Sequence, residues 1–165
     1  MNLYALLESG FPKDKPSCAI ETHDGLFYSW DDLEKATSKM ANLLASLRLP
    51  QGSRVAVQVE KSPEALFLYL ATLKAGLVYL PLNTAYQAAE IEYFIGNAEP
   101  AVMVCSPKNF SWVSKVAFKA GTKNVFTLGD DRTGTLLDRA RLPVTDCQKP
   151  GWSFLSSNKT SLLVV

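Results

Sequence analysis

Hydrophobic and polar positions follow two different periods along the middle of the chain. Four short apolar runs rich in β-branched residues predict buried strands: "RVAVQV" (54–59), "LVYLPL" (77–82), "AVMVCS" (101–106) and "NVFTL" (124–128). Between them, apolar residues recur at helical spacing over 63–74, 88–97 and 112–120. Strands that alternate with helices of this length form right-handed crossovers. The pattern therefore predicts an α/β fold with a largely parallel sheet flanked by helices.

A hairpin is predicted before this core. After a short helix over 3–7, the runs "SCAIET" and "LFYSW" flank the turn His23-Asp24-Gly25, and Asp-Gly between alternating runs is a strong turn signal. Ser29 is placed to cap a helix that extends to about Leu47. Its buried stripe is expected to comprise Leu33, Ala36, Met40, Leu43, Leu44 and Leu47.

The length of 165 residues fits one domain. We divide it into the helix, hairpin and helix of 1–50, a βαβ core at 51–128, an irregular connector at 129–160 with a short helix near 136–141, and a strand at 161–165. The final apolar run "SLLVV" is typical of a strand buried in a parallel sheet and followed by further elements. We therefore expect the chain to be part of a longer protein.

Charge and cysteine content narrow the class of protein. With 17 basic and 16 acidic residues, the chain has no basic excess to neutralise a phosphate backbone, so no nucleic-acid partner is expected. Cys18, Cys105 and Cys147 are far apart and odd in number, which indicates free thiols in a reducing compartment. The start lacks a signal-peptide pattern, and polar or helix-breaking residues interrupt the longest apolar stretch, 65–82. We predict a cytoplasmic protein without a membrane partner.

Residues with catalytic potential do not form a recognisable set. Lys61 follows a predicted strand, yet the segment "EKSPE" has no glycines and does not match a phosphate loop, so we interpret Lys61 as a solvated charge. His23 is the only histidine and lies in the predicted turn, without the other ligands of a metal site or the partners of a triad. Cys105 lies inside an apolar strand and is expected to be buried and inert.

The segment after the second core strand, "PLNTAYQ", raises the question of what its turn is for. Asn83 and Thr84 can bond to nearby backbone, which favours a capped connection between strand and helix. Tyr79 and Tyr86 add aromatic surface, either as core, which we favour, or as the wall of a pocket. From the residues alone, this turn is interpreted as scaffold.

A family resemblance extends over almost the whole chain. The segments "AIET", "FYSWDDLEKATSKMANLLASL" and "QGSRVAV", followed by "VEKSPEALFLYLATLKAGLVYLPLNTAYQAAEIEYFIGNAEPAVMVCSP", resemble the amino-terminal region of acyl-adenylate-forming enzymes. The combination of "EKSPEAL", "YLATLKAG", "YLPLNTAY" and "EYFIGNAEP" looks most like malonyl-CoA synthetases. These motifs belong largely to the scaffold.

The resemblance implies an ATP-dependent ligase that uses Mg²⁺ and CoA. In such enzymes a carboxylate, here malonate or methylmalonate, reacts with ATP to give an acyl-adenylate, and CoA then displaces AMP. The resemblance also implies that the CoA route passes near the turn after the "PLN" strand, where Thr84 and Tyr86 are candidate lining residues. Some relatives place a basic residue there, whereas this chain has Thr84, Ala85 and Tyr86.

The resemblance further implies that the catalytic motifs of the family lie outside this sequence. The Ser/Thr/Gly-rich phosphate loop would follow a strand like "SLLVV", so the chain alone is expected to be inactive and the remainder of the ligase to cover the final strand. Three alternatives stay open: a synthetase for another carboxylic acid, such as a short-, medium- or long-chain fatty acid, a catalytically inactive scaffold of the same ancestry, and an unrelated small nucleotide-binding domain. The last would need a glycine-rich first turn, which the sequence lacks.

Overall fold

The computed structural model describes residues 2–141 and 163–164. The chain opens with helix α1 (Leu3–Ser9), the strands β1 (Cys18–Glu21) and β2 (Phe27–Ser29), and helix α2 (Trp30–Ser46). The two strands pair antiparallel, which confirms the predicted hairpin. The cap at Ser29 is also confirmed, because its hydroxyl accepts the Asp32 amide at 3.1 Å while the Asp32 carboxylate accepts the Ser29 amide at 2.9 Å.

The predicted alternation of strands and helices is confirmed in the rest of the described chain. Its elements are β3 (Arg54–Gln58), α3 (Pro63–Lys74), β4 (Val78–Pro81), α4 (Ala88–Ala98), β5 (Val102–Cys105), the 3-10 helix η1 (Pro107–Asn109), α5 (Phe110–Lys119), β6 (Asn124–Thr127) and α6 (Thr135–Ala140). The strands β4, β3, β5 and β6 pair in that order, and every pair is parallel. The fold is α/β, as the sequence predicts.

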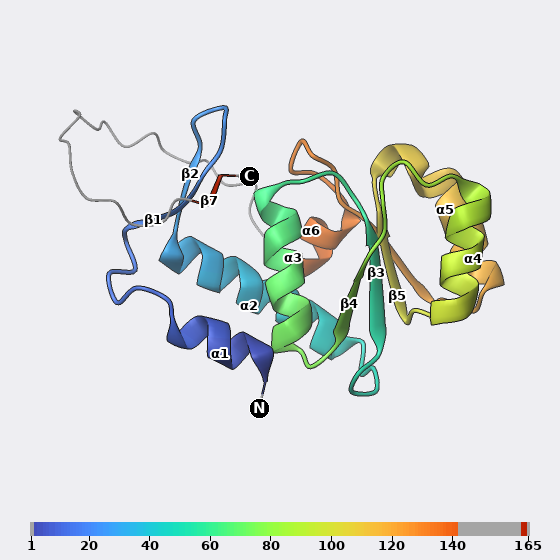
Figure 1. The fold of residues 1–165 in the computed structure, drawn as a ribbon, viewed down its shortest axis with the longest axis horizontal. Helices are drawn as coiled ribbons and strands as arrows, with labels where there is room; N and C mark the ends of the chain where they lie inside the picture. Colours follow the sequence, from blue (N-terminus) through green and yellow to red (C-terminus); the bar gives the residue numbers. More distant parts are fainter. Residues whose placement is uncertain (1, 142–162, 165) are drawn as a thin grey trace.

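The central strands β3 and β5 are buried on both faces, because their successive side chains pack into different cores. Val55 and Val57 of β3 belong to the core under α2, α3 and α6, whereas Ala56 between them belongs to the core under α4 and α5. The strand β5 divides in the same way, with Val104 on the first side and Met103 on the second. Figure 1 shows the resulting layers, with α2 and α3 on one side of the strands and α4 and α5 on the other.

The predicted buried stripe of α2 is confirmed in part. Leu33, Met40, Leu43 and Leu44 are buried, while Ala36 and Leu47 are only half-buried. Thr37 is fully buried, a position that the hydrophobic period did not include because its side chain carries a hydroxyl.

The predicted final strand joins the hairpin and not the four-stranded sheet. The strand β7 (Leu163–Val164) pairs in parallel with β1, so that the hairpin sheet has the order β2, β1, β7. The predicted connector beyond residue 141 and Cys147 lie outside the described residues. In the part of the chain that the structure describes, we find no helix with the length and hydropathy needed to cross a bilayer.

Candidate functional site

The carboxyl edge of the four-stranded sheet has the topology of a ligand site. The chain runs from β3 to β4 on one side and then crosses to β5 on the other side of β3. Open parallel sheets bind ligands at such a point, outside the carboxyl ends of the two strands where the direction changes. Here these strands are β3 and β5, which end at the paired residues Gln58 and Cys105.

The turn after β4 lies at this edge and is fixed by polar contacts. The Gln58 side-chain amide Nε2 donates to the carbonyl oxygens of Asn83 and Tyr86, each at 3.0 Å. Asn83 Oδ1 accepts the Ala85 amide at 2.9 Å, and the Tyr86 amide donates to the Asn83 carbonyl at 3.1 Å. The predicted backbone bond of Asn83 is thereby confirmed.

The two sequence-predicted site residues both lie on this turn. Thr84 is exposed. Tyr86 is half-buried and stacks on Phe94 of α4, with ring centroids 5.1 Å apart and planes inclined by 19°. Their assignment to a CoA route stays a prediction.

Sequence reasoning missed Gln58, the residue that ties this turn to the sheet. It is fully buried at the end of β3, on the same face as Ala56. The available signal was a glutamine inside the otherwise apolar run "RVAVQV", because a buried amide needs hydrogen-bond partners from another segment.

Charged residues flank the neighbouring turns but do not converge on a phosphate-sized site. Lys61 is exposed, consistent with the interpretation as a solvated charge. Lys108 after β5 lies 3.6 Å from Glu60 after β3, so this ion pair spans the point between the two strands. Both side chains are well exposed, and such pairs contribute little to stability.

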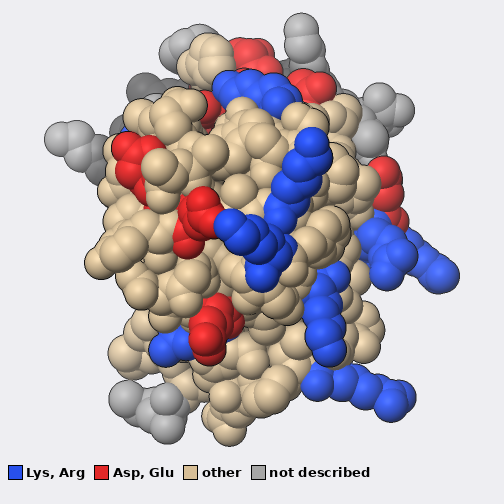
Figure 2. Space-filling model, turned by 90° about the vertical axis from the view of Figure 1, so that its right-hand side faces the viewer, with Lys and Arg blue, Asp and Glu red and all other residues tan. Residues whose placement is uncertain are grey.

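The face covered by α4 and α5 carries a mixed charge pattern. Figure 2 shows basic side chains on this side of the molecule with acidic ones among them. Lys119 of α5 pairs with Glu92 of α4 at 2.6 Å. We therefore interpret this face as a solvated surface with local ion pairs.

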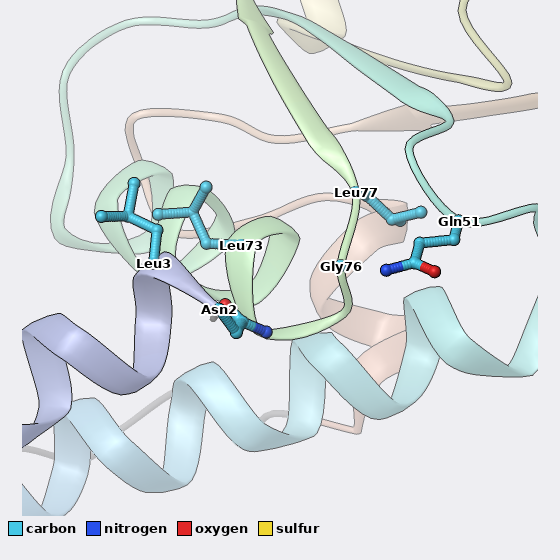
Figure 3. Close-up of a pocket in the computed structure, with 6 residues that line it drawn as sticks. All are labelled: Asn2, Leu3, Gln51, Leu73, Gly76 and Leu77. Atoms are coloured by element: carbon cyan, nitrogen blue, oxygen red, sulfur yellow. The ribbon is translucent and has the colours of Figure 1, made fainter.

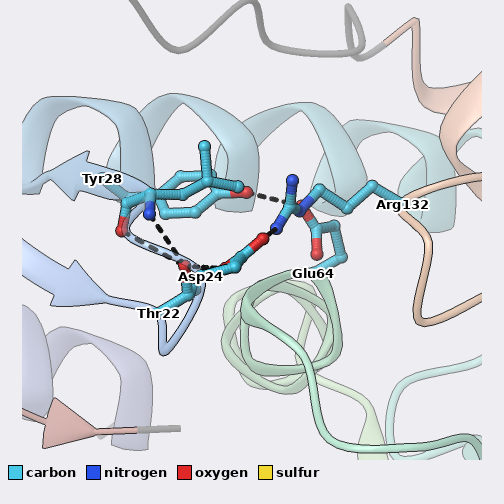
Figure 4. A network of polar contacts seen from close by, with 6 residues as sticks. Thr22, Asp24, Tyr28, Glu64 and Arg132 are labelled. Carbon is cyan, nitrogen blue, oxygen red and sulfur yellow. Dashed lines mark hydrogen bonds and ion pairs between the residues drawn. The ribbon is translucent and has the colours of Figure 1, made fainter. Parts of the chain in front are cut away.

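A second group of polar residues joins three segments that are far apart in the sequence. The Tyr28 hydroxyl donates to Glu64 Oε1 at 3.0 Å, which links β2 to the start of α3. Arg132, after β6, donates to Asp24 Oδ2 at 2.9 Å and so reaches the hairpin turn (Figure 4). Hydrogen bonds from Thr22 and Arg132 lower the pKa of Asp24 below its usual value. This network ties the hairpin to α3 and to the segment after β6.

Removing the Tyr28 hydroxyl tests how much this network stabilises the fold. Glu64 is only 6% exposed and its Oε2 has no hydrogen-bond partner in the part of the chain that the structure describes, so Tyr28→Phe leaves a buried carboxylate without the Tyr28 bond. We expect a loss of about 2 kcal/mol in the free energy of unfolding, measured by urea denaturation. The control is Tyr93→Phe, because Tyr93 is 66% exposed. Equal midpoints for the two variants would contradict the assigned role.

The remaining candidate residues from the sequence are His23 and Cys105. His23 is exposed on the hairpin turn. Cys105 is buried, as expected, and burial raises the pKa of its thiol to about 12, which keeps it protonated and unreactive at neutral pH. Within residues 2–141 and 163–164, the His, Cys, Asp and Glu side chains form no cluster of three or more that could hold a metal ion.

A hollow of about 330 Å³ lies near the opposite, amino end of the strands (Figure 3). It is lined by Asn2, Leu3, Gln51, Leu73, Gly76 and Leu77. None of these side chains titrates or acts as a nucleophile, so the hollow offers no chemistry of its own.

Comparison with known proteins identifies the architecture. The family model described as "AMP-binding enzyme" matches residues 9–153. The crystal structure of ATP-bound MatB from Rhodopseudomonas palustris superposes with a TM-score of 0.80 at 46% sequence identity over 86% of this chain and 28% of that chain.

Two curated relatives widen the range of activities in the comparison. A hybrid PKS-NRPS synthetase from Acremonium sp is 31% identical over 52% of this chain and 2% of its own length. A crotonobetaine/carnitine–CoA ligase from Salmonella paratyphi B is 27% identical over 59% of this chain and 19% of its own length. The chain thus spans less than a third of each of the three proteins compared.

Proposed function

The chain belongs to the family of AMP-binding enzymes, and from this membership we propose that it is the amino-terminal part of an ATP-dependent malonyl-CoA synthetase. The observation that carries the proposal is the 46% identity over 86% of this chain to ATP-bound MatB, a malonyl-CoA synthetase. The adenylate-forming fold alone would not select a substrate, because likeness of fold does not imply likeness of function.

The proposed reaction has two steps. A malonate carboxylate oxygen attacks the α-phosphorus of ATP, the bond to the β-phosphate oxygen breaks, and pyrophosphate leaves. The sulfur of CoA then forms a bond to the acyl carbon of malonyl-adenylate, AMP leaves, and the thiol proton passes to solvent. Enzymes accelerate such steps by positioning the reactants and by stabilising the developing negative charge.

The described residues do not fit the groups that this chemistry needs for ATP and Mg²⁺. The sequence contains no glycine-rich phosphate loop, and residues 2–141 and 163–164 offer no carboxylate cluster for an ion. We propose that both are held by the part of the ligase outside this chain, that residues 1–165 are a partial adenylation domain, and that this chain alone is inactive. Its own contribution is the scaffold and the turn that carries Thr84 and Tyr86, proposed to line the CoA route.

Two alternative functions can be distinguished from this proposal by experiment. The match to a crotonobetaine/carnitine–CoA ligase favours a different carboxylic acid as the alternative substrate. A catalytically inactive scaffold of the same ancestry is the other alternative. Both predict a failure with malonate, but only the first predicts turnover with another acid.

The test is an assay of the intact protein that contains this chain. Incubation with ATP, Mg²⁺, CoA and malonate is expected to release AMP and form malonyl-CoA, whereas the 165-residue chain alone releases none. AMP formation with a long-chain fatty acid or carnitine, but not with malonate, would overturn the malonate assignment. The absence of AMP with every acid would favour the inactive scaffold.

A further inference from the structure

We infer that Gln58 is a positioning residue that holds the turn at residues 83–86 in the conformation that CoA requires. This inference rests on the proposed function, because it assigns a role within the proposed CoA route. Gln58 itself is fully buried in the core, so the role that we assign to it is to position the turn.

The contacts of Gln58 define its role. One nitrogen, Nε2, donates to two carbonyl oxygens, those of Asn83 and Tyr86, each at 3.0 Å. These two carbonyls belong to the residues on either side of Thr84 and Ala85, so the amide is bonded to both ends of the exposed part of the turn. Among the described residues, the hydrogen bonds that connect residues 83–86 to the sheet both come from Gln58.

The other contacts of the turn are local or lead to α4. Asn83 and the amides of Ala85 and Tyr86 bond within the turn, which sets its shape but not its place on the sheet. The Tyr86 ring stacks on Phe94, which connects it to a neighbouring helix. Without Gln58, the turn would keep its internal bonds and lose both hydrogen bonds that residues 83–86 make to β3. Its attachment to that strand would then end at Leu82, whose amide donates to the Val57 carbonyl at 2.8 Å.

The polarity of Gln58 is poorly explained by core packing alone. Its Oε1 is buried and has no hydrogen-bond partner among the described residues. A half-satisfied buried amide costs free energy, and an apolar side chain of similar length would avoid this cost. What the amide adds in return is the pair of bonds to the turn, at the switch point where parallel sheets bind ligands.

The experiment replaces Gln58 in the intact ligase by methionine, which keeps the length and apolar volume but removes both donors. The KM for CoA is expected to rise about tenfold, the effect of losing roughly one or two buried hydrogen bonds. Malonate-dependent exchange of pyrophosphate into ATP, which does not involve CoA, should change less than twofold. If the methionine variant does not fold, Gln58→Asn replaces it in the experiment. The asparagine side chain is one methylene shorter, so we expect this variant to raise the KM for CoA as well.

A matched control is available at the opposite edge of the same sheet. Thr122 is only 2% exposed and its hydroxyl donates to the Pro100 carbonyl at 2.8 Å, so it is also a buried residue whose side chain bonds to backbone. Thr122→Val should lower stability without changing the KM for CoA. This control separates a general loss of stability from displacement of the turn.

The outcomes distinguish this inference from the proposed function. If the wild-type protein forms no adenylate with any acid, the proposed function fails before Gln58 is tested. If the wild type forms malonyl-CoA and the Gln58 variants leave the KM for CoA unchanged, the inference fails alone. An equal loss in both half-reactions, or an equal shift for Thr122→Val, would show that Gln58 is only structural.

Discussion

Replacing Gly134 by alanine is expected to lower the free energy of unfolding by about 3 kcal/mol. Gly134 has φ of +135°, a region that other residues rarely adopt. A Cβ atom there would lie 2.3 Å from the Thr127 carbonyl oxygen, 2.8 Å from its carbon and 3.0 Å from Leu128 Cα. All three are backbone atoms, so no side-chain rotation relieves the overlap.

The surrounding bonds explain why the backbone cannot move aside easily. The Thr127 amide donates to Thr135 Oγ1 at 2.9 Å, and the Thr135 amide donates to Thr127 Oγ1 at 3.0 Å. These reciprocal bonds hold the end of β6 against the start of α6. An alanine at position 134 must strain this arrangement or break it.

Urea denaturation followed by circular dichroism measures the effect. Gly96→Ala serves as the control, because Gly96 lies inside α4 and an added Cβ would meet no atom within 4 Å. That change should raise stability by about 0.5–1 kcal/mol, since alanine is the better helix former. Similar shifts for both variants would contradict the steric argument.

Replacing Ile91 by alanine should lower the free energy of unfolding by about 3 kcal/mol, within the range for buried aliphatic side chains. Ile91 is fully buried in the core between the sheet and the helices α4 and α5, together with Leu82, Ile95 and Met103. Truncation removes apolar contacts and leaves a cavity that the surrounding side chains fill only in part. Because α4 follows the turn at residues 83–86, its packing also bears on the candidate site.

Asn97→Ala provides the control on the same helix. Asn97 is exposed, so its replacement should change stability by less than about 0.5 kcal/mol. The comparison uses thermal and urea unfolding of both variants under identical conditions. A loss of stability for Ile91→Ala no larger than that for Asn97→Ala would show that this core does not support the fold.

The candidate site was predictable only in outline. The turn at residues 83–86 follows from the sequence, because Pro81 ends the strand pattern and a helical period begins soon after. Thr84 and Tyr86 could be placed on that turn. The attachment through Gln58 could not be predicted, since its partners lie 25 and 28 residues away and no local pattern specifies them.

The α/β class, the alternation of strands and helices along the chain and the family resemblance all follow from the sequence. Periodicity, caps and turn residues act over a few positions, so they can be read directly along the chain. The three-dimensional fold was needed to establish the spatial strand order β4, β3, β5, β6, the pairing of β7 with β1, and the contact between Tyr28 and Glu64. These features depend on packing between distant segments, whose free energy is set by burial and hydrogen bonding in three dimensions.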